Sequence, residues 1–434
     1  MRPLRIGFAG NQNNSPFMLA RALRTTGHDV RFLVDRPEPL NRPEFRYADI
    51  SYPYPSWIEE IPTFEVDDVV YRTAAWKTLL DRLSDCDVVV LNSMAFAAAA
   101  DLNVPAICQI TGSDLEFYCD RSRGERYALF QDYAGRTRHW RRAIRDMREP
   151  STESLRHVAN GLPSPLFHYY RAHMFRKAVD RHTAGLRASR AVICLPTGAV
   201  PLSDRLLDAA LTPATARVLS FMVESDRFQP LPLPSTGPLR IFNPARLNWS
   251  EPAPQWVNPW ENKRTDILLE GVAQFVQRST YPIAVHLVEK GHAVEATHAL
   301  VKRLGIESHV HWHREMPQSE LTTHYEQAHV IADQFGDHLV GLAGYEGMAM
   351  GRPLLCNWRP DVFTRAFGEE APVAQARTPT EVAEQLIRLT HPAYRQALAT
   401  QGRAFVARQL TPQVFLERLR PVLDSIRSRR RLAA

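Results

Sequence analysis

The sequence predicts an α/β protein made of two doubly wound domains that face each other across a cleft. Two successive series of short apolar runs, each run followed by a turn and a helical pattern, support this fold class. A proline-rich stretch separates the two series. The length of 434 residues is enough for two to three domains of ~150 residues. A content of 44% hydrophobic and 23% charged residues is typical of a folded, soluble chain.

The first predicted domain covers residues 1–229. It opens with a strand at 4–10 (LRIGFAG), a helix at 15–27 and a second strand at 28–34. Three further apolar runs have the length of central parallel strands that are covered on both faces, at 87–93, 104–111 and 190–196.

A linker is predicted at residues 230–238, because four prolines make this stretch unable to continue a helix or a central strand. The second domain, 239–410, alternates strands at 239–247, 282–291, 308–314, 329–335 and 352–357 with helices at 265–279, 293–305, 319–328 and near 345–351. Residues 411–434 have the pattern of an amphipathic helix. Parallel strands joined by helices place ligand sites at their carboxyl ends.

The cysteines and the N-terminus predict a cytoplasmic protein. Five cysteines at irregular spacing indicate reduced thiols, and three of them lie in apolar runs. The N-terminus lacks the apolar stretch of a signal peptide, and no run approaches the ~20 apolar residues of a membrane span. Any membrane contact is therefore expected to be peripheral, at the inner face.

Positive charge is concentrated in residues 121–187, which contain 15 Lys or Arg against 6 Asp or Glu. Such a segment attracts nucleic acid, anionic lipid headgroups or a phosphorylated substrate, or it is only a solvated helical face. We rank nucleic acid last and expect no nucleic-acid partner. A phosphorylated substrate or an anionic membrane surface remains as the functional interpretation.

The most informative segment follows the strand at 329–335. Gly336, Gly341 and Gly344 allow the backbone to approach a ligand closely, and a helix expected to begin near Tyr345 would aim its free N–H groups at a diphosphate. Glu346 is expected in the first turn of that helix. There the helix dipole stabilises a carboxylate, which is also able to accept hydrogen bonds from sugar hydroxyls.

This segment resembles the donor-site signature of the GT-B glycosyltransferases, in particular glycosyltransferase family 4. The family signature is a Gly-rich loop followed by Glu-Ala-Met-Ala-x-Gly-x-Pro, and residues 346–353 read Glu-Gly-Met-Ala-Met-Gly-Arg-Pro, with Gly347 as the departure. Further similar segments are NPARLNW, KRTDILLEGV, FMVESDRFQP and the run from LGIESHV to HVIAD.

The resemblance implies the GT-B fold and a glycosyltransferase involved in polysaccharide biosynthesis. Such an enzyme moves a sugar from a UDP- or GDP-sugar to a hydroxyl of a glycan, lipid-linked or small-molecule acceptor, with retention of configuration. The nucleotide sugar is a co-substrate, and neither a cofactor nor a metal is expected, because Arg and Lys replace the metal. By the same analogy, the helix at 411–434 crosses back to the first domain.

The resemblance also implies roles for individual residues on the donor side. Arg246 and Lys263 match the cations that bind the diphosphate and assist its departure, and Glu346 matches the carboxylate that holds the ribose. Backbone N–H groups of the Gly-rich loop complete the anion site, at Gly341, Leu342, Ala343 and Gly344. His338 stands where the family's Glu-x7-Glu motif has its first Glu and is assigned to the donor sugar. Trp256 and Trp260, in an insertion, either roof the donor or pack against the surface.

The acceptor side is predicted at the first strand end, where Gly10, Asn11, Asn13 and Asn14 offer neutral groups that suit hydroxyls or simply form a loop. Thr111 occupies the His position of the family's His-Gly-x-Asp motif. Asp114 is a candidate catalytic group that contacts acceptor or donor sugar, or else a turn residue. A retaining reaction of this type does not require a strong enzymic base.

Two alternatives complete the analysis. His309, His311 and His313 would place three imidazoles on one strand face, but this run aligns with a structural strand of the family, and no metal site is expected. The departures at His338 and Thr111 motivate a second functional class, a catalytically silent GT-B-fold binding or scaffold protein. The intact Arg246, Lys263 and Glu346 favour the enzyme.

Overall fold

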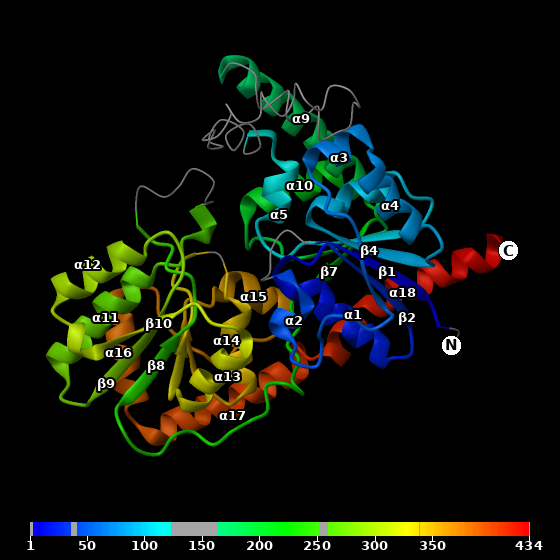
Figure 1. Ribbon diagram of the computed structural model, residues 1–434. Helices are drawn as coiled ribbons and strands as arrows, with labels where there is room; N and C mark the ends of the chain where they lie inside the picture. Colours follow the sequence, from blue (N-terminus) through cyan, green and yellow to red (C-terminus); the bar gives the residue numbers. More distant parts are fainter. Residues whose placement is uncertain (1–2, 36–40, 123–163, 251–258, 338, 434) are drawn as a thin grey trace.

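The chain forms two parallel β-sheets, each with helices on both faces (Figure 1). The computed structural model describes residues 3–35, 41–122, 164–250, 259–337 and 339–433. The predicted fold class, two Rossmann-like doubly wound domains, is confirmed.

The first sheet has seven strands in the order β3-β2-β1-β4-β5-β6-β7. Their bounds are β1 (Arg5–Ala9), β2 (Asp29–Val34), β3 (Ile58–Glu60), β4 (Val88–Asn92), β5 (Ala106–Gln109), β6 (Ala191–Cys194) and β7 (Ala216–Leu219). The accompanying helices are α1 (Ser15–Thr25), α2 (Pro43–Arg46), α3 (Val66–Tyr71), α4 (Ala74–Leu83), α5 (Asp114–Cys119), α9 (Ser164–Ala188) and α10 (Pro201–Ala210), with 3-10 turns η1 (Gln12–Asn14) and η3 (Ser93–Ala100).

The second sheet has six strands in the order β10-β9-β8-β11-β12-β13. They are β8 (Leu239–Asn243), β9 (Ile283–Glu289), β10 (Val310–Arg314), β11 (Val330–Ala332), β12 (Leu354–Cys356) and β13 (Ala374–Gln375). The helices are α11 (Thr265–Arg278), α12 (Val294–Leu304), α13 (Gln318–Gln327), α14 (Leu342–Ala349), α15 (Pro360–Phe367), α16 (Pro379–Leu389), α17 (Pro392–Gln409) and α18 (Pro412–Ala433), with 3-10 turns η4 (Pro259–Glu261) and η5 (Glu307–His309).

The apolar runs account for the central strands. Every residue of β4, β5 and β6 is buried, as expected for parallel strands with helices on both sides. The sequence analysis missed β3, β7 and β13, because these edge strands have only two to four residues and carry few buried apolar side chains.

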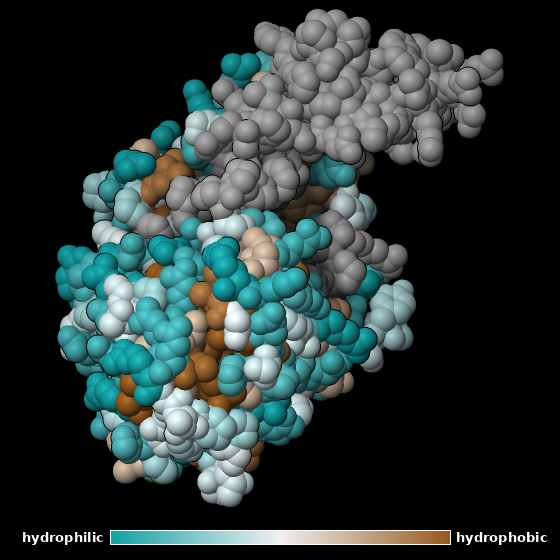
Figure 2. Space-filling view, turned by 90° about the vertical axis from the view of Figure 1, so that its left-hand side faces the viewer, coloured by the Kyte–Doolittle hydropathy of each residue, from teal (hydrophilic) through white to brown (hydrophobic). Residues whose placement is uncertain are grey.

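The surface on the side of the second domain is mostly hydrophilic, with apolar atoms in a narrow band near its middle (Figure 2).

The helix expected near Tyr345 begins three residues earlier, at Leu342. The N–H of Gly344 already donates to the carbonyl of Gly341, so the first turn closes there. Glu346 is therefore the fifth residue of α14, and its expected place in the first turn was wrong.

Residues 230–238 contain no helix or strand, and the Arg352 guanidinium holds the start of this stretch against the second domain. The fully buried guanidinium donates to the carbonyls of Leu231 and Pro232 at 3.1 and 3.0 Å, and also to those of Tyr325 and Glu326. Burial lowers the pKa of Arg352. One side chain thus ties the proline-rich connection to α13.

The C-terminal helix α18 leaves the second domain and packs along the first (Figure 1). It contacts α1 and β7, and its apolar face joins the core beneath the first sheet, with Phe415, Leu419, Val422, Leu423 and Ile426. The segment after β7 meets the segment before α18: the N–H of Val223 donates to the carbonyl of Leu410 at 2.7 Å.

All five cysteines lie in the described residues, where they are buried and form no disulfide. No helix in the described ranges is long and apolar enough to cross a membrane. Cys86, Cys108 and Cys194 have raised thiol pKa values because the side chains are buried.

The histidine pattern on β10 differs from the prediction, because His309 ends a 3-10 turn and only His311 and His313 lie on the strand. His286 of β9 completes a row with them: its ring stacks on His311 at 4.6 Å, and its Nδ1 lies 2.8 Å from Nε2 of His313. His324 of α13 meets the ring of His313 at 4.4 Å. Within the described part of the chain, no group of three or more His, Cys, Asp or Glu residues could hold a metal ion.

We predict that Leu419→Ala lowers the free energy of unfolding by about 2–5 kcal/mol, because the side chain is fully buried between α18 and the first sheet. Urea denaturation followed by circular dichroism measures the change. Arg420→Ala, one residue further on the exposed face, is the matched control and should leave stability nearly unchanged. Equal effects of the two substitutions would contradict this packing of α18.

We predict that acid destabilises the protein in part through His286, whose pKa burial lowers to about 3, aided by the charge of Arg240. The unfolded chain binds this proton near pH 6.5 and the folded chain does not, so stability is lost as pH falls below 6.5. Between pH 6.5 and 5 this residue should account for about 2 kcal/mol. Urea titrations of the wild type and His286→Phe at pH 7.5 and 5 measure it; an equal loss in both proteins would refute the assignment.

Candidate functional site

The order of the second sheet reverses between β8 and β11. In open parallel sheets, the ligand-binding crevice lies at the carboxyl ends of the two strands at such a reversal. Two loops meet there, the β8–α11 connection and the β11–α14 connection. Arg246 follows β8, Lys263 precedes α11, Asp333 follows β11, and Gly341 precedes α14. The predicted cations and the predicted Gly-rich loop are thus brought to one place, although they come from separate stretches of sequence.

Lys263 is the central cation of this crevice. Its Nζ donates to Oε1 of Gln334 at 2.8 Å. Burial lowers the pKa of Lys263, the charge of Arg246 acts in the same direction, and Asp333 opposes both. The side chain of Arg246 is exposed, so the two cations lie close enough to interact while one of them faces solvent.

Asp333 holds the Gly-rich loop through a backbone hydrogen bond. Its side chain is buried, and its Oδ2 accepts a hydrogen bond from the N–H of Gly341. Burial raises the pKa of Asp333 to about 6, even though Lys263 stabilises the carboxylate. A Cβ at position 341 would lie 2.8–3.0 Å from the polar ends of Gln334 and Asp333, so a larger residue here would displace these two side chains. The N–H groups of Leu342 and Ala343, in the first turn of α14, point out of the helix as donors.

Glu346 lies in a buried network between the two domains. Gln318 Nε2 donates to both carboxylate oxygens at 3.0 Å, and the Tyr325 hydroxyl donates at 3.3 Å. Arg46 of the first domain adds an ion pair at 2.9 Å. Contact of Glu346 with a ribose stays a prediction, as does the sugar contact of His338, which lies outside the described residues.

Gly347 departs from the signature for a packing reason. A Cβ at this position would lie 2.5 Å from Cγ1 of Ile331 on β11. The branched Ile331 is fully buried under α14, so the helix approaches the strand closely only because residue 347 has no side chain. The departure thus reflects the fit of α14 on β11 and leaves the donor-side groups in place.

In the first sheet the order reverses between β1 and β4, and the predicted acceptor loop lies at that point. Asn14 is buried, and Asn11 donates to Asn14 Oδ1 and to the carbonyl of Asn41, so both hold the loop itself. Asn13 is exposed, and it has a positive φ of 56°. Gly10 directly follows β1 and has a φ of 82°.

The side chain of Asp114 points into the protein, where it binds its own turn. Only 4% of it is exposed, and its carboxylate accepts bonds from the N–H groups of Thr111, Gly112 and Leu115 and from Asn92 Nδ2. Burial raises the pKa of Asp114 to about 6, although these hydrogen bonds favour the charged form. The carboxylate therefore holds the turn that presents Thr111; a catalytic role of Asp114 stays a prediction.

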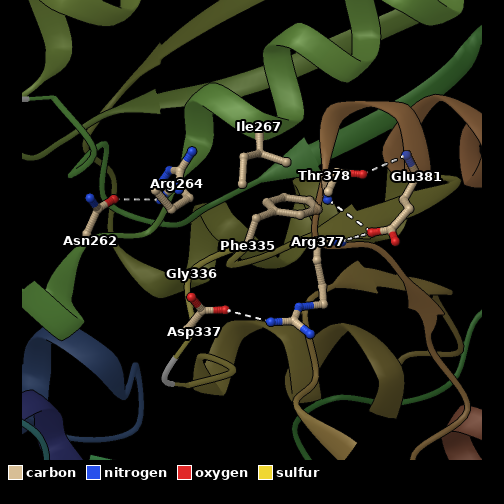
Figure 3. A pocket seen from close by; sticks show the side chains of 9 residues that line it. All are labelled: Asn262, Arg264, Ile267, Phe335, Gly336, Asp337, Arg377, Thr378 and Glu381. Atoms are coloured by element: carbon tan, nitrogen blue, oxygen red, sulfur yellow. Dashed lines mark hydrogen bonds and ion pairs between the residues drawn. The ribbon is translucent and has the colours of Figure 1, made fainter.

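A polar pocket of about 430 Å³ adjoins the Lys263 segment (Figure 3). It is lined by Asn262, Arg264 and Ile267 from the start of α11, Phe335, Gly336 and Asp337 after β11, and Arg377, Thr378 and Glu381 at the start of α16. Its charges are matched within the protein: Arg377 faces Asp337 at 3.4 Å, Arg264 pairs with Asp266 at 2.9 Å, and Glu381 caps α16. Lys263 itself does not line this pocket.

The tryptophan of the insertion that the structure describes, Trp260, is buried in the core, and its ring centroid lies 6.0 Å from Lys263 Nζ. This supports packing over a roof for the donor. Trp256 lies outside the described residues, as does most of the basic segment, residues 123–163.

Sequence reasoning missed five residues of the site: Arg46, Gln318, Tyr325, Asp333 and Gln334. The sequence of α13 has the pattern of an ordinary surface helix, so it does not mark Gln318 or Tyr325. Arg46 lies 300 residues from Glu346 in the chain. Asp333 and Gln334 did carry a signal, because they directly follow a buried strand.

No known protein-family profile matches this chain, and no curated protein matches it by sequence. Solved structures do match over nearly the whole length. HepE from Anabaena, in complex with UDP and glucose, has a TM-score of 0.60 at 13% identity, covering 97% of this chain and 100% of its own.

Sucrose-phosphate synthase from Thermosynechococcus elongatus has a TM-score of 0.56 at 14% identity, with 99% of each chain covered. A glycosyltransferase from Rickettsia africae has a TM-score of 0.57 at 11% identity, covering 98% of this chain and 99% of its own. The chain therefore has the GT-B fold that these glycosyltransferases share.

We predict that Gly347→Ala lowers the free energy of unfolding by about 1–3 kcal/mol, because the new methyl group overlaps Ile331. Chemical denaturation of Gly347→Ala, Ile331→Ala and the double variant forms a double-mutant cycle. The double variant should be more stable than the sum of the single losses. Strict additivity would show that α14 and β11 do not meet at this point.

Proposed function

We propose that the protein is a retaining glycosyltransferase that uses a nucleotide sugar, a UDP- or GDP-sugar, as donor. The observation that carries this proposal is the convergence of Arg246, Lys263 and the free N–H groups at the start of α14 on the β8/β11 crevice of a GT-B fold. These groups form an anion site of the kind that a nucleoside diphosphate requires. HepE, a structure with the same fold, was solved with UDP and with UDP-glucose.

In this proposal an acceptor oxygen bonds to the anomeric carbon on the face from which the diphosphate leaves. The bond between that carbon and the diphosphate oxygen breaks, and the acceptor's proton passes to the departing phosphate oxygen. Lys263 and Arg246 stabilise the negative charge that develops on the diphosphate. Lys263 is preorganised for this by Gln334, so the charge is held in place before the donor arrives.

The acceptor would enter from the β1/β4 side, where Asn13, Thr111 and the neighbouring backbone offer neutral hydrogen-bonding groups. A hydroxyl of a glycan, a lipid-linked sugar or a small molecule suits this chemistry. We keep a cytoplasmic location with peripheral contact to an anionic membrane as part of the proposal, on the basis of the charge in residues 121–187. The expectation of a reaction without a metal rests on the two cations taking that role.

We predict that one of UDP, GDP and ADP binds to the wild type, and that Lys263→Ala weakens its binding at least about tenfold, because a charge-assisted bond to the diphosphate is lost. Isothermal titration calorimetry with each nucleotide measures this. Arg264→Ala is the matched control, since the neighbouring guanidinium is exposed and pairs with Asp266, and it should bind like the wild type.

Sugar release or transfer from the matching nucleotide sugar, lost in Lys263→Ala, would then establish the activity. Binding that survives unchanged in Lys263→Ala would place the nucleotide elsewhere and refute this site. A wild-type protein that binds none of the three nucleotides would favour the silent scaffold protein instead.

A further inference from the structure

Arg46 reaches from the first domain into the second and pairs with Glu346. The Nη2 to Oε1 distance is 2.9 Å, and the two side chains are 11% and 4% exposed. Arg46 ends the short helix α2, which packs on α13 of the second domain. A charge pair this deeply buried is costly to desolvate, so removing either partner leaves an unmatched charge inside the protein.

The carboxylate of Glu346 has little capacity left for another ligand. Gln318 donates to both oxygens and Tyr325 to one, while Arg46 takes the remaining side. A carboxylate offers about four acceptor positions. Any further pair of hydroxyl donors at Glu346 must therefore displace one of the present partners.

Arg46 is the partner with an alternative. Its Nε is buried without a hydrogen-bond partner and lies 3.8 Å from Oε2 of Glu224, in the segment that leaves the first sheet. Glu224 is fixed there by the Tyr47 hydroxyl and by Arg227 Nη1, both at 2.9 Å. Arg227 also donates to the carbonyl of Arg46 at 2.8 Å, so the backbone is held while the guanidinium sits between two carboxylates.

We propose that Arg46 is an interdomain latch that nucleotide binding releases: the ribose hydroxyls compete with the guanidinium for Glu346, and Arg46 turns to Glu224. The inference rests on the proposed function, and it takes up the prediction from the resemblance that Glu346 contacts the ribose of the nucleotide. Because the two interactions compete for Glu346, thermodynamic linkage makes the effect of each on the other equal. The latch lowers the affinity for the nucleotide, and the nucleotide weakens the contact of α2 with α13 by the same factor.

The first test is calorimetric titration of the wild type, Arg46→Gln and Arg42→Gln with UDP, and in parallel with GDP and ADP. Arg46→Gln should bind the matching nucleotide about tenfold more tightly, since the competitor is gone. Arg42→Gln is the matched control: this arginine pairs with Glu44 and Glu60 inside the first domain and should leave the affinity unchanged. Weaker or equal binding by Arg46→Gln would overturn the latch.

The second test needs no substitution and so does not depend on the folding of Arg46→Gln. Hydrogen exchange of the wild type should accelerate at the N–H groups of Phe45 and Tyr47, which close α2, when the matching nucleotide is added. Slower or unchanged exchange there would overturn the proposal.

The outcomes separate the latch from the function. If a nucleotide binds, Lys263→Ala abolishes binding and Arg46→Gln leaves it unchanged, only the latch fails. If the wild type binds a nucleotide, Lys263→Ala binds it more weakly and Arg46→Gln binds it more tightly, both stand. If neither protein binds any of the three nucleotides, the proposed function fails and the latch with it.

Discussion

The rest of the structure depends on the common direction of the strands. Every described strand pair is parallel, so all carboxyl ends in a sheet lie at one edge, and the connecting loops with their polar side chains gather there. Each sheet reverses its order once, between β1 and β4 and between β8 and β11. The two candidate half-sites lie at these two points, because only there do neighbouring loops diverge and leave room for a ligand.

Buried charge then decides how the loops are held. Asp333, Lys263, Glu346 and Arg46 all lie in surroundings that disfavour an isolated charge. Lys263, before α11, interacts with Gln334 and Asp333 of the loop after β11, and Glu346 of α14 pairs with Arg46 of α2. The desolvation cost is offset only if these loops stay together. A shift of the Gly-rich loop would leave Asp333 without Gly341, and a separation of the domains would leave Glu346 without Arg46. The site is therefore coupled to the contact between domains.

Two connections hold the domains to one another. Arg352 binds the proline-rich stretch through carbonyl oxygens, and α18 returns to complete the core under the first sheet. Arg352 belongs to the second domain and binds the stretch that leads to the first domain. The helix α18 starts at the second domain and ends on the first. Movement of one domain relative to the other must therefore bend these connections and stretch the ion pair of Arg46 with Glu346.

The sequence alone determined the elements that have a local signature. Long apolar runs predicted the central strands, because a strand covered on both faces has no polar position. The motifs around Arg246, Lys263 and the Gly-rich loop predicted a donor side through their resemblance to a family. The edge strands β3, β7 and β13 were not predicted, because short and partly exposed strands lack that pattern.

Only the tertiary structure decided which groups meet. The pairing of Arg46 with Glu346, the inward turn of Asp114 and the fit of Gly347 on Ile331 each depend on contacts between segments that are distant along the chain. No periodicity or spacing encodes such contacts, because they arise from the packing of whole sheets and helices. The physical reason is that burial and partner choice are properties of the assembled fold, whereas local pattern fixes only the type of each element.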